Sequence, residues 1–546
     1  MLRPRDGGGV EASADVIAPG VDVPDAATVS DAAVTDVAET LEVPRLTRPL
    51  SFAVVGTALP ELRWVLPERA SGAQVQVCDD SACMRGVQTI DAQGNVVRLT
   101  ASLAQRAYFW RVRARYGERF SAWSPSWEFL VQGNANVMVS WYGFTDFDRD
   151  GSADIVVGAP GANGGRGAVL VYRGKMDPAN LPYSVLAGGA EERDVGGAVT
   201  LGDVDGDGIA DVVCTGSIST PSGPRGGLHV VSFAAVPAGL PTIRRLSESD
   251  DTARVSSVSF VGDVDGDGYG DVAVGSPTAQ NLQGELRVLL GSATGLSSTR
   301  SVVIQPGTDY RSLGNTILAT GDLNRDRLDD FLVTSLSLIG QTQAHSVRGR
   351  SPLLAQSVAV MPVATGGLQD VGRSTTALGD LNADGANDFL LGAESGEVAL
   401  YLSELTTAAE ERMPTAIRAS TGCAKAGPGA VGRFGFANEL GSFLLQCQLE
   451  PMRSEIIRMR WEAGVLRRVA GAFAAPSSAD RDFGGASSSS GDFNADGVAD
   501  VVIVRRTDGQ PDALEVAGRM PDGRAWTVRL GSNPGQPVGN VLVLPQ

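Results

Sequence analysis

The chain has 546 residues, 43% of them hydrophobic, and no apolar run approaches the ~18 residues that are needed to cross a bilayer. Its formal net charge of −18 argues against a nucleic acid partner, because phosphate contacts require a basic face. Its two histidines, His229 and His345, are far apart in sequence, which leaves little basis for a His-based triad or a zinc hydrolase.

Residues 1–46 are rich in Ala, Val and Asp and contain no aromatic residue, so we predict a disordered acidic linker. Glycines and acids follow the first five residues in place of an apolar core, so no signal peptide is visible. The leader resembles the spacer behind the lipidated cysteine of bacterial surface lipoproteins. That resemblance implies a lipid anchor outside this chain. Without a visible signal peptide, either the protein is cytosolic or an export signal lies outside this chain.

Residues 47–132 predict a small β-sandwich. Segments 62–66 and 74–77 alternate between apolar and polar residues with the period of a half-buried strand. The run from Tyr108 to Arg115, followed by Gly117 and the segment 121–129, resembles the last two strands of a fibronectin type III domain. We interpret the aromatic residues of this segment as core residues; the alternative is a sugar-binding aromatic face.

The five cysteines favour an oxidising compartment. Cys78 and Cys83 bracket a short turn and are close enough for a disulfide across a hairpin. Cys423 and Cys447 could form a second bridge, and we expect Cys214, which stands in an apolar strand, to be a buried free thiol. Metal binding by these residues is not expected, because no Cys-x-x-Cys pair occurs.

From residue 133 to residue 546 the chain repeats a short acidic loop. The loops begin at Asp146, Asp203, Asp263, Asp322, Asp380 and Asp492, at separations of 57, 60, 59, 58 and 112 residues. The last interval is close to two periods, and the gap holds strand-like segments at 434–436 and 441–446 without an acidic turn. Seven units of about four strands each predict an all-β, seven-bladed propeller, with residues 538–544 sealing the ring against the first blade.

Each loop follows the pattern Asp-x-Asp/Asn-x-Asp-Gly-x-x-Asp, which places hard oxygen ligands on one tightly curled segment, as Ca²⁺ prefers. Positions 1, 3, 5 and 9 supply side chains, and position 7 supplies its carbonyl oxygen. The candidate ligands are Asp146, Asp148, Asp150, Ser152 and Asp154; Asp203, Asp205, Asp207, Ile209 and Asp211; Asp263, Asp265, Asp267, Tyr269 and Asp271; Asp322, Asn324, Asp326, Leu328 and Asp330; Asp380, Asn382, Asp384, Ala386 and Asp388; and Asp492, Asn494, Asp496, Val498 and Asp500.

An EF-hand is the alternative reading of these loops, but it requires Glu at position 12 and helices on both sides. Position 12 is an apolar residue or a cysteine here: Val157, Cys214, Val274, Val333, Leu391 and Ile503. The flanking residues are those of strands, as in Val501-Val502-Ile503-Val504. We therefore expect calcium-binding turns between strands. Acidic turns without metal are the remaining alternative.

The repeats resemble FG-GAP repeats, the units of the integrin α-chain propeller and of many bacterial surface proteins. Phe434-Gly435 and Phe483-Gly484 match the first element of the motif, and Gly158-Ala159-Pro160 and Gly275-Ser276-Pro277 match the second. The resemblance covers residues 133–546. It implies that each calcium turn joins the first two strands of a blade, on the face opposite the one that usually binds ligands.

The loops are not equivalent. Those at Asp380 and Asp492 have Asn at position 3, and the loop at Asp322 has Arg327 in place of the glycine at position 6. A residue with a side chain resists positive φ at that position, and its guanidinium group could partly neutralise the site. We expect about five calcium ions, with the site at Asp322 weak or empty.

A closed carboxylate cage favours structural over catalytic calcium, and no catalytic constellation is found. The first hypothesis is therefore a non-enzymatic, extracellular or cell-surface adhesion-type module with a protein or glycan ligand. Its candidate surface comprises Asp309-Tyr310-Arg311, Arg373, Arg433 and Asp480-Arg481-Asp482. The alternatives are a secreted polysaccharide lyase or hydrolase on a propeller scaffold, and a passive envelope protein that displays the N-terminal domain.

Overall fold

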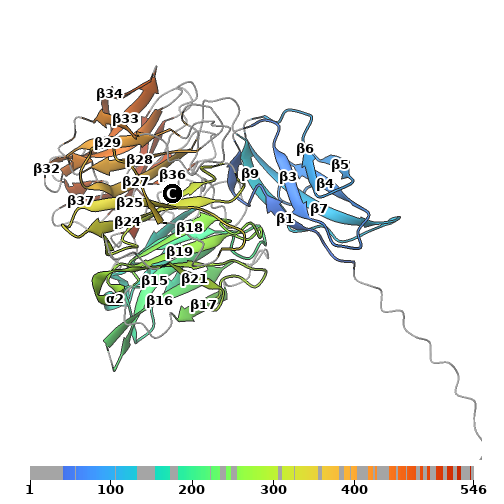
Figure 1. Ribbon diagram of the computed structural model, residues 1–546, viewed down its shortest axis with the longest axis horizontal. Coiled ribbons are helices and arrows are strands. Elements are labelled where there is room, and N and C mark those ends of the chain that lie inside the picture. The colour runs from blue at the N-terminus through green and yellow to red at the C-terminus, as the bar shows by residue number, and fades with distance from the viewer. Residues whose placement is uncertain are drawn as a thin grey trace, which may run out of the picture. The chain divides into compact units, whose positions relative to one another are not determined.

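The computed structural model describes residues 41–55, 57–104, 106–131, 154–172, 183–221, 223–233, 242–247, 255–304, 310–324, 326–353, 360–379, 381, 387–393, 395–402, 416–421, 423, 425–426, 442–450, 453–462, 464–474, 480–483, 489–491, 500–507, 513–519, 525–529 and 541–542. Residues Leu41–Gln546 form one compact unit. The structure is almost entirely β (Figure 1), and none of its described helices is long and apolar enough to cross a membrane.

The N-terminal residues form two sheets. One contains β1 (Arg45–Arg48), β3 (Glu61–Val65) and β6 (Val96–Arg98); the other contains β2 (Ala53–Val55), β9 (Trp127–Val131), β7 (Ala107–Tyr116), β4 (Gly72–Cys78) and β5 (Gln88–Ala92), with β8 (Arg119–Phe120) beside β7. β1 begins two residues inside the segment that the sequence assigns to the linker.

Alternation along β7 explains the N-terminal core. Tyr108, Trp110 and Val112 are buried, and the residues between them are half-buried on the other face. Trp110 and Trp127 meet edge to face, with ring centroids 6.2 Å apart, within one cluster that draws on both sheets. The prediction of core aromatic residues is therefore confirmed for Trp64, Tyr108, Trp110, Trp127 and Phe129. Phe120 and Trp123 are half-buried and stack with arginine side chains. The likeness to fibronectin type III stays a prediction. The disulfide Cys78–Cys83 is confirmed.

Among the described residues, seven antiparallel sheets follow in chain order, and their number equals that of the predicted repeat units. The first contains β10 (Ile155–Gly158), β11 (Ala168–Tyr172), β12 (Tyr183–Ala187) and the C-terminal β40 (Val541–Leu542); the second contains β13 (Glu192–Arg193), β14 (Val199–Gly202), β15 (Asp211–Thr220), β16 (Gly223–Ser232) and β17 (Thr242–Ser247); the third contains β18 (Ser257–Gly262), β19 (Asp271–Ser276), β20 (Glu285–Leu289) and β21 (Ser301–Ile304).

The remaining sheets have the same meander. The fourth contains β22 (Tyr310–Arg311), β23 (Ile317–Gly321), β24 (Asp330–Ser337), β25 (Thr342–Val347) and β26 (Val360–Pro362); the fifth contains β27 (Val371–Gly379), β28 (Asp388–Ala393), β29 (Glu397–Tyr401) and β30 (Ala416–Ser420); the sixth contains β31 (Lys425–Ala426), β32 (Ser442–Glu450), β33 (Arg453–Glu462) and β34 (Val465–Ala474); the seventh contains β35 (Asp480–Phe483), β36 (Ser489–Gly491), β37 (Asp500–Thr507), β38 (Ala513–Arg519) and β39 (Ala525–Arg529).

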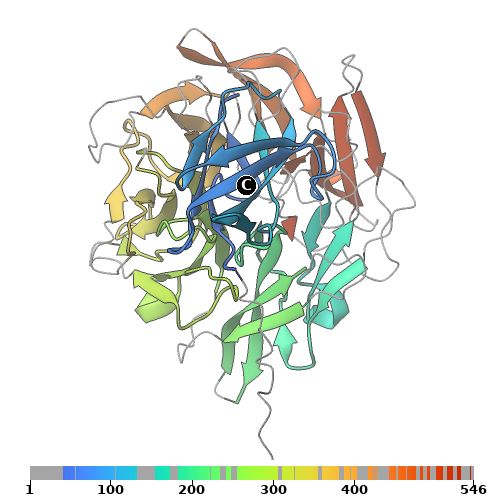
Figure 2. The ribbon, with the colours of Figure 1, turned by 90° about the vertical axis from the view of Figure 1, so that its right-hand side faces the viewer.

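The sheets are arranged around a common centre (Figure 2), which makes the fold a β-propeller. The inner strands β14, β18, β23 and β27 contact one another in that order. Strands such as β15 are buried on both faces, because each sheet packs between two others. The pairing of Val157 with Leu542 confirms the prediction that a C-terminal strand joins the first blade. Closure of this kind leaves no exposed sheet edge at the seam.

The helical segments α1 (Ala162–Gly165) and α2 (Ala279–Leu282) are single turns, which connect β10 to β11 and β19 to β20. The glycines of the nearby Gly-Ala-Pro and Gly-Ser-Pro motifs have a packing role. A Cβ atom on Gly158 would lie 2.1 Å from the carbonyl oxygen of Gly196, and one on Gly275 would lie 2.0 Å from that of Gly314. Glycine is required there because the backbone of the next blade approaches so closely.

Candidate metal centre

The second and third acidic loops are described completely, and the fourth is described except for Arg325. Of the other candidate ligands, Asp154 and Asp388 are described, and for Asp500 the structure gives the backbone alone. The rest lie outside the described residues: Asp146, Asp148, Asp150, Ser152, Asp380, Asn382, Asp384, Ala386, Asp492, Asn494, Asp496 and Val498.

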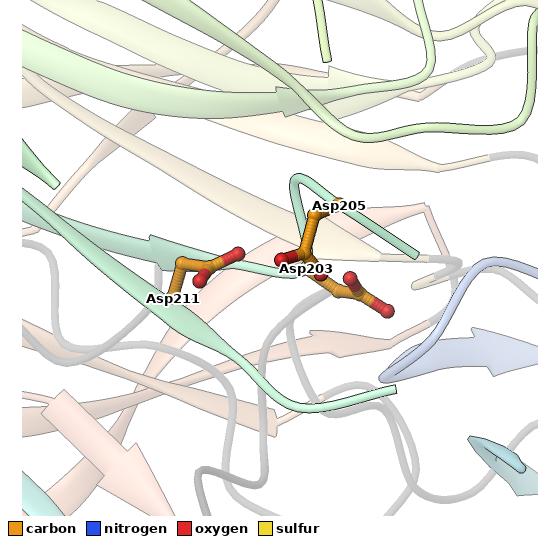
Figure 3. Close-up of side chains that lie close together, drawn as sticks. All are labelled: Asp203, Asp205 and Asp211. Carbon is orange, nitrogen blue, oxygen red and sulfur yellow. The ribbon is translucent and has the colours of Figure 1, made fainter. Parts of the chain in front are cut away.

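In the second loop the carboxylates of Asp203, Asp205 and Asp211 converge. One oxygen from each lies within 4.8 Å of the others, with Asp211 contributed by the start of β15 and the other two by the turn (Figure 3). Backbone amides orient them: Gly206 and Gly208 donate to the two oxygens of Asp203, at 2.6 and 2.9 Å, and Val204 donates to Oδ2 of Asp211 at 3.0 Å. The turn thus aims several carboxylates at one point.

The third loop also gathers three carboxylates, but from positions 1, 3 and 5: Asp263, Asp265 and Asp267 each place an oxygen within 4.8 Å of the others. Gly268 donates to Oδ2 of Asp263 at 2.9 Å, and Val264 donates to Oδ2 of Asp271 at 2.8 Å. The same hydrogen bonds recur because residues with the same spacing curl the backbone in the same way. Ile209 and Tyr269 occupy position 7 in the two loops.

The electrostatics of these two loops favour a cation. Burial, followed by the neighbouring carboxylates, raises the pKa of Asp203 and of Asp271 well above the usual range, and raises that of Asp211 to about 8. Burial raises the pKa of Asp263 to about 7, although Arg48 opposes this shift. Clustered buried carboxylates are unfavourable when all are ionised, and a divalent ion would remove that penalty.

The residues present fit calcium. Oδ1 of Asp263 is buried and has no hydrogen-bond partner, so this oxygen is available to coordinate a metal. All side-chain donors in the two loops are carboxylate oxygens, the hard ligands that Ca²⁺ takes in sets of six to eight. No His or Cys side chain belongs to either cluster, so the donor set does not suit zinc.

The fourth loop departs from this arrangement. Arg327 adopts φ 73° at position 6, where Gly208 and Gly268 have φ 84° and 87°. Two other guanidinium groups make ion pairs with carboxylates of this loop: Arg348 Nη1 lies 2.7 Å from Oδ2 of Asp330, and Arg48 Nη2 lies 3.6 Å from Oδ1 of Asp329. The sequence indicates that this loop differs, but it does not identify these partners.

In the fifth loop, Asp388 is buried, and its Oδ2 accepts from Leu381 N at 2.6 Å. This bond corresponds to the one between Asp211 and Val204 in the second loop. Position 9 therefore closes the turn onto position 2 in each loop for which the structure describes both residues.

Sequence reasoning missed that consecutive loops are hydrogen-bonded to each other. Gly270 N donates to the carbonyl oxygen of Asp203 at 3.3 Å, and Asp329 N donates to that of Asp263 at 3.0 Å. In the fifth loop, Asn387 Nδ2 donates to the carbonyl oxygen of Thr320, which lies in β23 just before the fourth loop, at 3.1 Å. In all three bonds the donor residue stands at position 8 of its loop, a position to which the motif gives no ligand role. The loops therefore join neighbouring blades as well as the strands of one blade.

The N-terminal sheets also contact these loops. Trp127 Nε1 donates to the carbonyl oxygen of Gly206 at 3.0 Å, and the Arg45 guanidinium lies 5.1 Å from the ring centroid of Tyr269. Arg48, from the same strand as Arg45, contacts the fourth loop. Residues distant in sequence thus surround the second to fourth loops.

The histidines are strand residues with hydrogen-bond partners, in agreement with an incidental role. His229 Nε2 lies 2.9 Å from Oε1 of Glu192, and His345 Nε2 lies 2.7 Å from Oγ of Ser335. Burial lowers the pKa of His345 to about 4. Cys214 is a buried free thiol, as predicted. Cys423 is disulfide-bonded, and the side chain of its expected partner, Cys447, lies outside the described residues.

Comparison with known proteins supports the repeat assignment. Residues 146–214 match the model of an FG-GAP-like repeat, and residues 255–289 match that of the FG-GAP repeat. Integrin alpha-V of Gallus gallus is 27% identical over 198 residues, which are 34% of this chain and 19% of the relative. Integrin alpha-11 of Homo sapiens is 25% identical over 291 residues, which are 52% of this chain and 23% of the relative.

The chain thus spans less than a quarter of the length of these relatives. Among solved structures, the subtype N11 neuraminidase-like protein of A/flat-faced bat/Peru/033/2010 (H18N11) is similar over 70% of this chain and 98% of its own, at 11% identity and a TM-score of 0.30. The repeat matches, the integrin relatives and the ring of antiparallel sheets agree with one another. This chain carries an FG-GAP-repeat β-propeller of the integrin-α-like kind.

Proposed function

We propose that this chain is a calcium-stabilised, extracellular binding protein of the adhesion type, in which the metal is structural and the propeller displays a ligand-binding surface. The observation that carries the proposal is the convergence of Asp203, Asp205 and Asp211 at a turn between two strands of one blade. An ion there would hold β14 and β15 together at the end where the next blade is also hydrogen-bonded.

In the second loop, Asp203, Asp205, Asp207 and Asp211 would hold the ion with their side chains, and Ile209 with its carbonyl oxygen. When bound, calcium would neutralise the repulsion among these carboxylates. The backbone amides of the turn orient the carboxylates, and the third loop offers the same set. Because the donors surround one point within a closed turn, we propose a binding role rather than a catalytic one.

The extracellular or surface setting is supported by the disulfides. Cys78 and Cys83 are bridged, and Cys423 is also disulfide-bonded. Disulfides form and persist in oxidising compartments and are rare in the cytosol. Calcium sites of structural type also suit an environment in which the ion is abundant.

The ligand surface is proposed at the strand ends remote from the loops. Tyr310 and Arg311 pair with Ser337 and Leu336, whereas the acidic loop joins β24 at its other end, at Asp330. β35 likewise pairs with the end of β37 that is distant from residue 500. Of the other candidates, Arg373 is described by its backbone alone, and Asp309 and Arg433 lie outside the described residues.

The first test is metal content. Elemental analysis of protein purified in the presence of calcium should find about five calcium ions per chain. Removal by a chelator should lower the melting temperature, because an ion that binds only the folded state stabilises it. One ion or none, with an unchanged melting temperature after chelation, would contradict the proposal.

The second test addresses the ligand. The protein is screened against glycan and extracellular-protein arrays with calcium and after chelation, and hits are compared with a variant carrying Tyr310→Ala and Arg311→Ala. A ligand that requires calcium and is lost with this variant supports binding at the predicted surface. A ligand that the variant retains would place the binding surface elsewhere.

A further inference from the structure

A buried arginine side chain, Arg348, places a positive charge at the fourth acidic loop. Arg348 and Asp330 are 5% and 0% exposed, and Nη1 of the arginine lies 2.7 Å from Oδ2 of the aspartate. Asp330 holds position 9, where Asp271 stands in the third loop. Both aspartates accept from a backbone amide of position 2 and from a glycine amide, Gly349 or Gly291. The surroundings of these two aspartates therefore differ chiefly in the arginine.

Strand register places this arginine opposite position 9 of the fourth loop, where the second and third blades have no arginine. Val347 pairs with Phe331, so Arg348 stands opposite Asp330. By the same pairing, Leu290 and Ser232 stand opposite Asp271 and Asp211 in the third and second blades. At the rim of the third loop, Arg300 pairs with Asp267 and is 48% exposed.

A second guanidinium group reaches the fourth loop from the N-terminal sheets. Arg48 of β1 lies 3.6 Å from the carboxylate of Asp329, which is fully buried, while the arginine side chain is 21% exposed. Asp263 and Asp322 also interact electrostatically with this guanidinium group. The guanidinium group is therefore held in a field of several carboxylates.

We propose that the fourth loop takes two arginines in place of calcium, Arg348 from its own blade and Arg48 from the N-terminal domain, and that it is the docking site of that domain. The inference rests on the proposed calcium role of the second and third loops. A guanidinium group is always charged and can satisfy buried carboxylates, so it supplies the positive charge without a metal. The contacts of Arg45 and Trp127 with the third and second loops extend the same interface.

Metal stoichiometry tests the first half of the proposal. Calcium is counted by titration calorimetry in the wild type, in Asp330→Asn and in the matched variant Asp271→Asn. We expect Asp271→Asn to bind one ion fewer and Asp330→Asn to bind as many as the wild type. Loss of one ion in Asp330→Asn would overturn the proposal. If Asp271→Asn binds as many calcium ions as the wild type, the proposed calcium site of the third loop is contradicted instead.

Asp330→Asn leaves Arg348 buried without its partner and could prevent folding. The double variant Asp330→Asn/Arg348→Gln replaces the ion pair by a neutral hydrogen-bonding pair. Its calcium count should also equal that of the wild type, and a count lower by one would overturn the proposal. Circular dichroism confirms that each counted variant is folded.

Hydrogen exchange tests the docking. Arg48→Gln keeps a polar side chain of similar length but removes the charge, and Arg85→Gln is the control, because Arg85 is 79% exposed and pairs with Asp80 of its own domain. With Arg48→Gln, the amides of residues 45–48 and of Asp263 should exchange roughly tenfold faster, with no change in the calcium count. Exchange at the wild-type rate would overturn the proposal, as would equal acceleration in the control.

Discussion

Asp263 and Asp329 form a reciprocal pair across two blades: Asp263 N donates to Oδ2 of Asp329 at 2.8 Å, and Asp329 N donates to the carbonyl oxygen of Asp263 at 3.0 Å. One residue opens the third acidic loop and the other stands at position 8 of the fourth. The pair joins two turns that the sequence presents as independent repeats. It also brings Arg48 of the N-terminal sheets to the junction.

Asp329→Ala should destabilise the folded protein by about 1–3 kcal/mol, because it leaves the buried amide of Asp263 without its acceptor. The arginine Arg48 would also lose its counter-charge. Urea unfolding in calcium measures the effect. Asp326→Ala, in the exposed part of the same loop, is the control. Equal losses in both variants would show that the junction is no more important than the turn itself.

Removal of one ligand should weaken one blade only. Asp205→Ala deletes one of three converging carboxylates of the second loop, so the melting temperature in calcium should fall, but by less than after full chelation. Differential scanning calorimetry with and without a chelator makes the comparison. If both treatments leave the melting temperature unchanged, the loops are ordinary acidic turns.

The pH dependence of stability should largely disappear when calcium is bound. In the metal-free protein, burial raises the pKa of Asp211 to about 8 and of Asp263 to about 7, above the value of ~3.9 in an unfolded chain. The folded state then binds more protons than the unfolded state between roughly pH 4 and pH 8, so stability should decrease as pH rises through that window. Calcium keeps these carboxylates ionised in the folded state, and the unfolded chain has them ionised above about pH 5, so the stability of the loaded protein should change little over the same rise.

Melting temperatures of metal-free and calcium-loaded protein, measured from pH 5 to pH 8, check this prediction. Asp211→Asn should flatten the metal-free curve, because it removes one titrating group. Parallel curves for the two forms would show that these carboxylates are not the calcium ligands.

Arg327→Gly should stabilise the fourth loop by about 1 kcal/mol, because Arg327 has φ 73°, a region that glycine reaches without strain. The backbone bond from residue 327 to Asp322 is kept. Chemical unfolding measures the gain. Gly268→Ala in the third loop, at φ 87°, should have the opposite effect. A loss of stability in Arg327→Gly would mean that the arginine side chain contributes contacts of its own.

Gly275→Ala should destabilise the third blade by about 1–3 kcal/mol, because a Cβ atom there would meet the carbonyl oxygen of Gly314 at 2.0 Å. Gly161→Ala is the matched control, since a Cβ atom on Gly161 has no neighbour within 4 Å. Thermal unfolding of the two variants gives the difference. Similar melting temperatures would show that the blades can move apart without cost.

The sequence alone determines the acidic turns, because their ligands and the amides that orient them lie within nine consecutive residues. Asp203, Asp205 and Asp211 could therefore be assigned to one cluster before any tertiary contact was known. The even spacing of the loops also indicated the repeated sheets, and the terminal segment around Leu542 was assigned correctly to the first blade. The alternation of apolar and polar residues along β7 also predicted correctly that this segment is a strand with one buried face.

The tertiary structure decided which charges meet across repeats. Arg348 is one of many arginines in the sequence, and only strand register places it opposite Asp330. Arg48 lies hundreds of residues before Asp329 in the chain, and only the packing of the N-terminal sheets brings the two side chains together. Such pairings depend on how separate sheets pack, which a local pattern does not encode. The sequence therefore indicates that the fourth loop is different, and the fold shows which cations it contains.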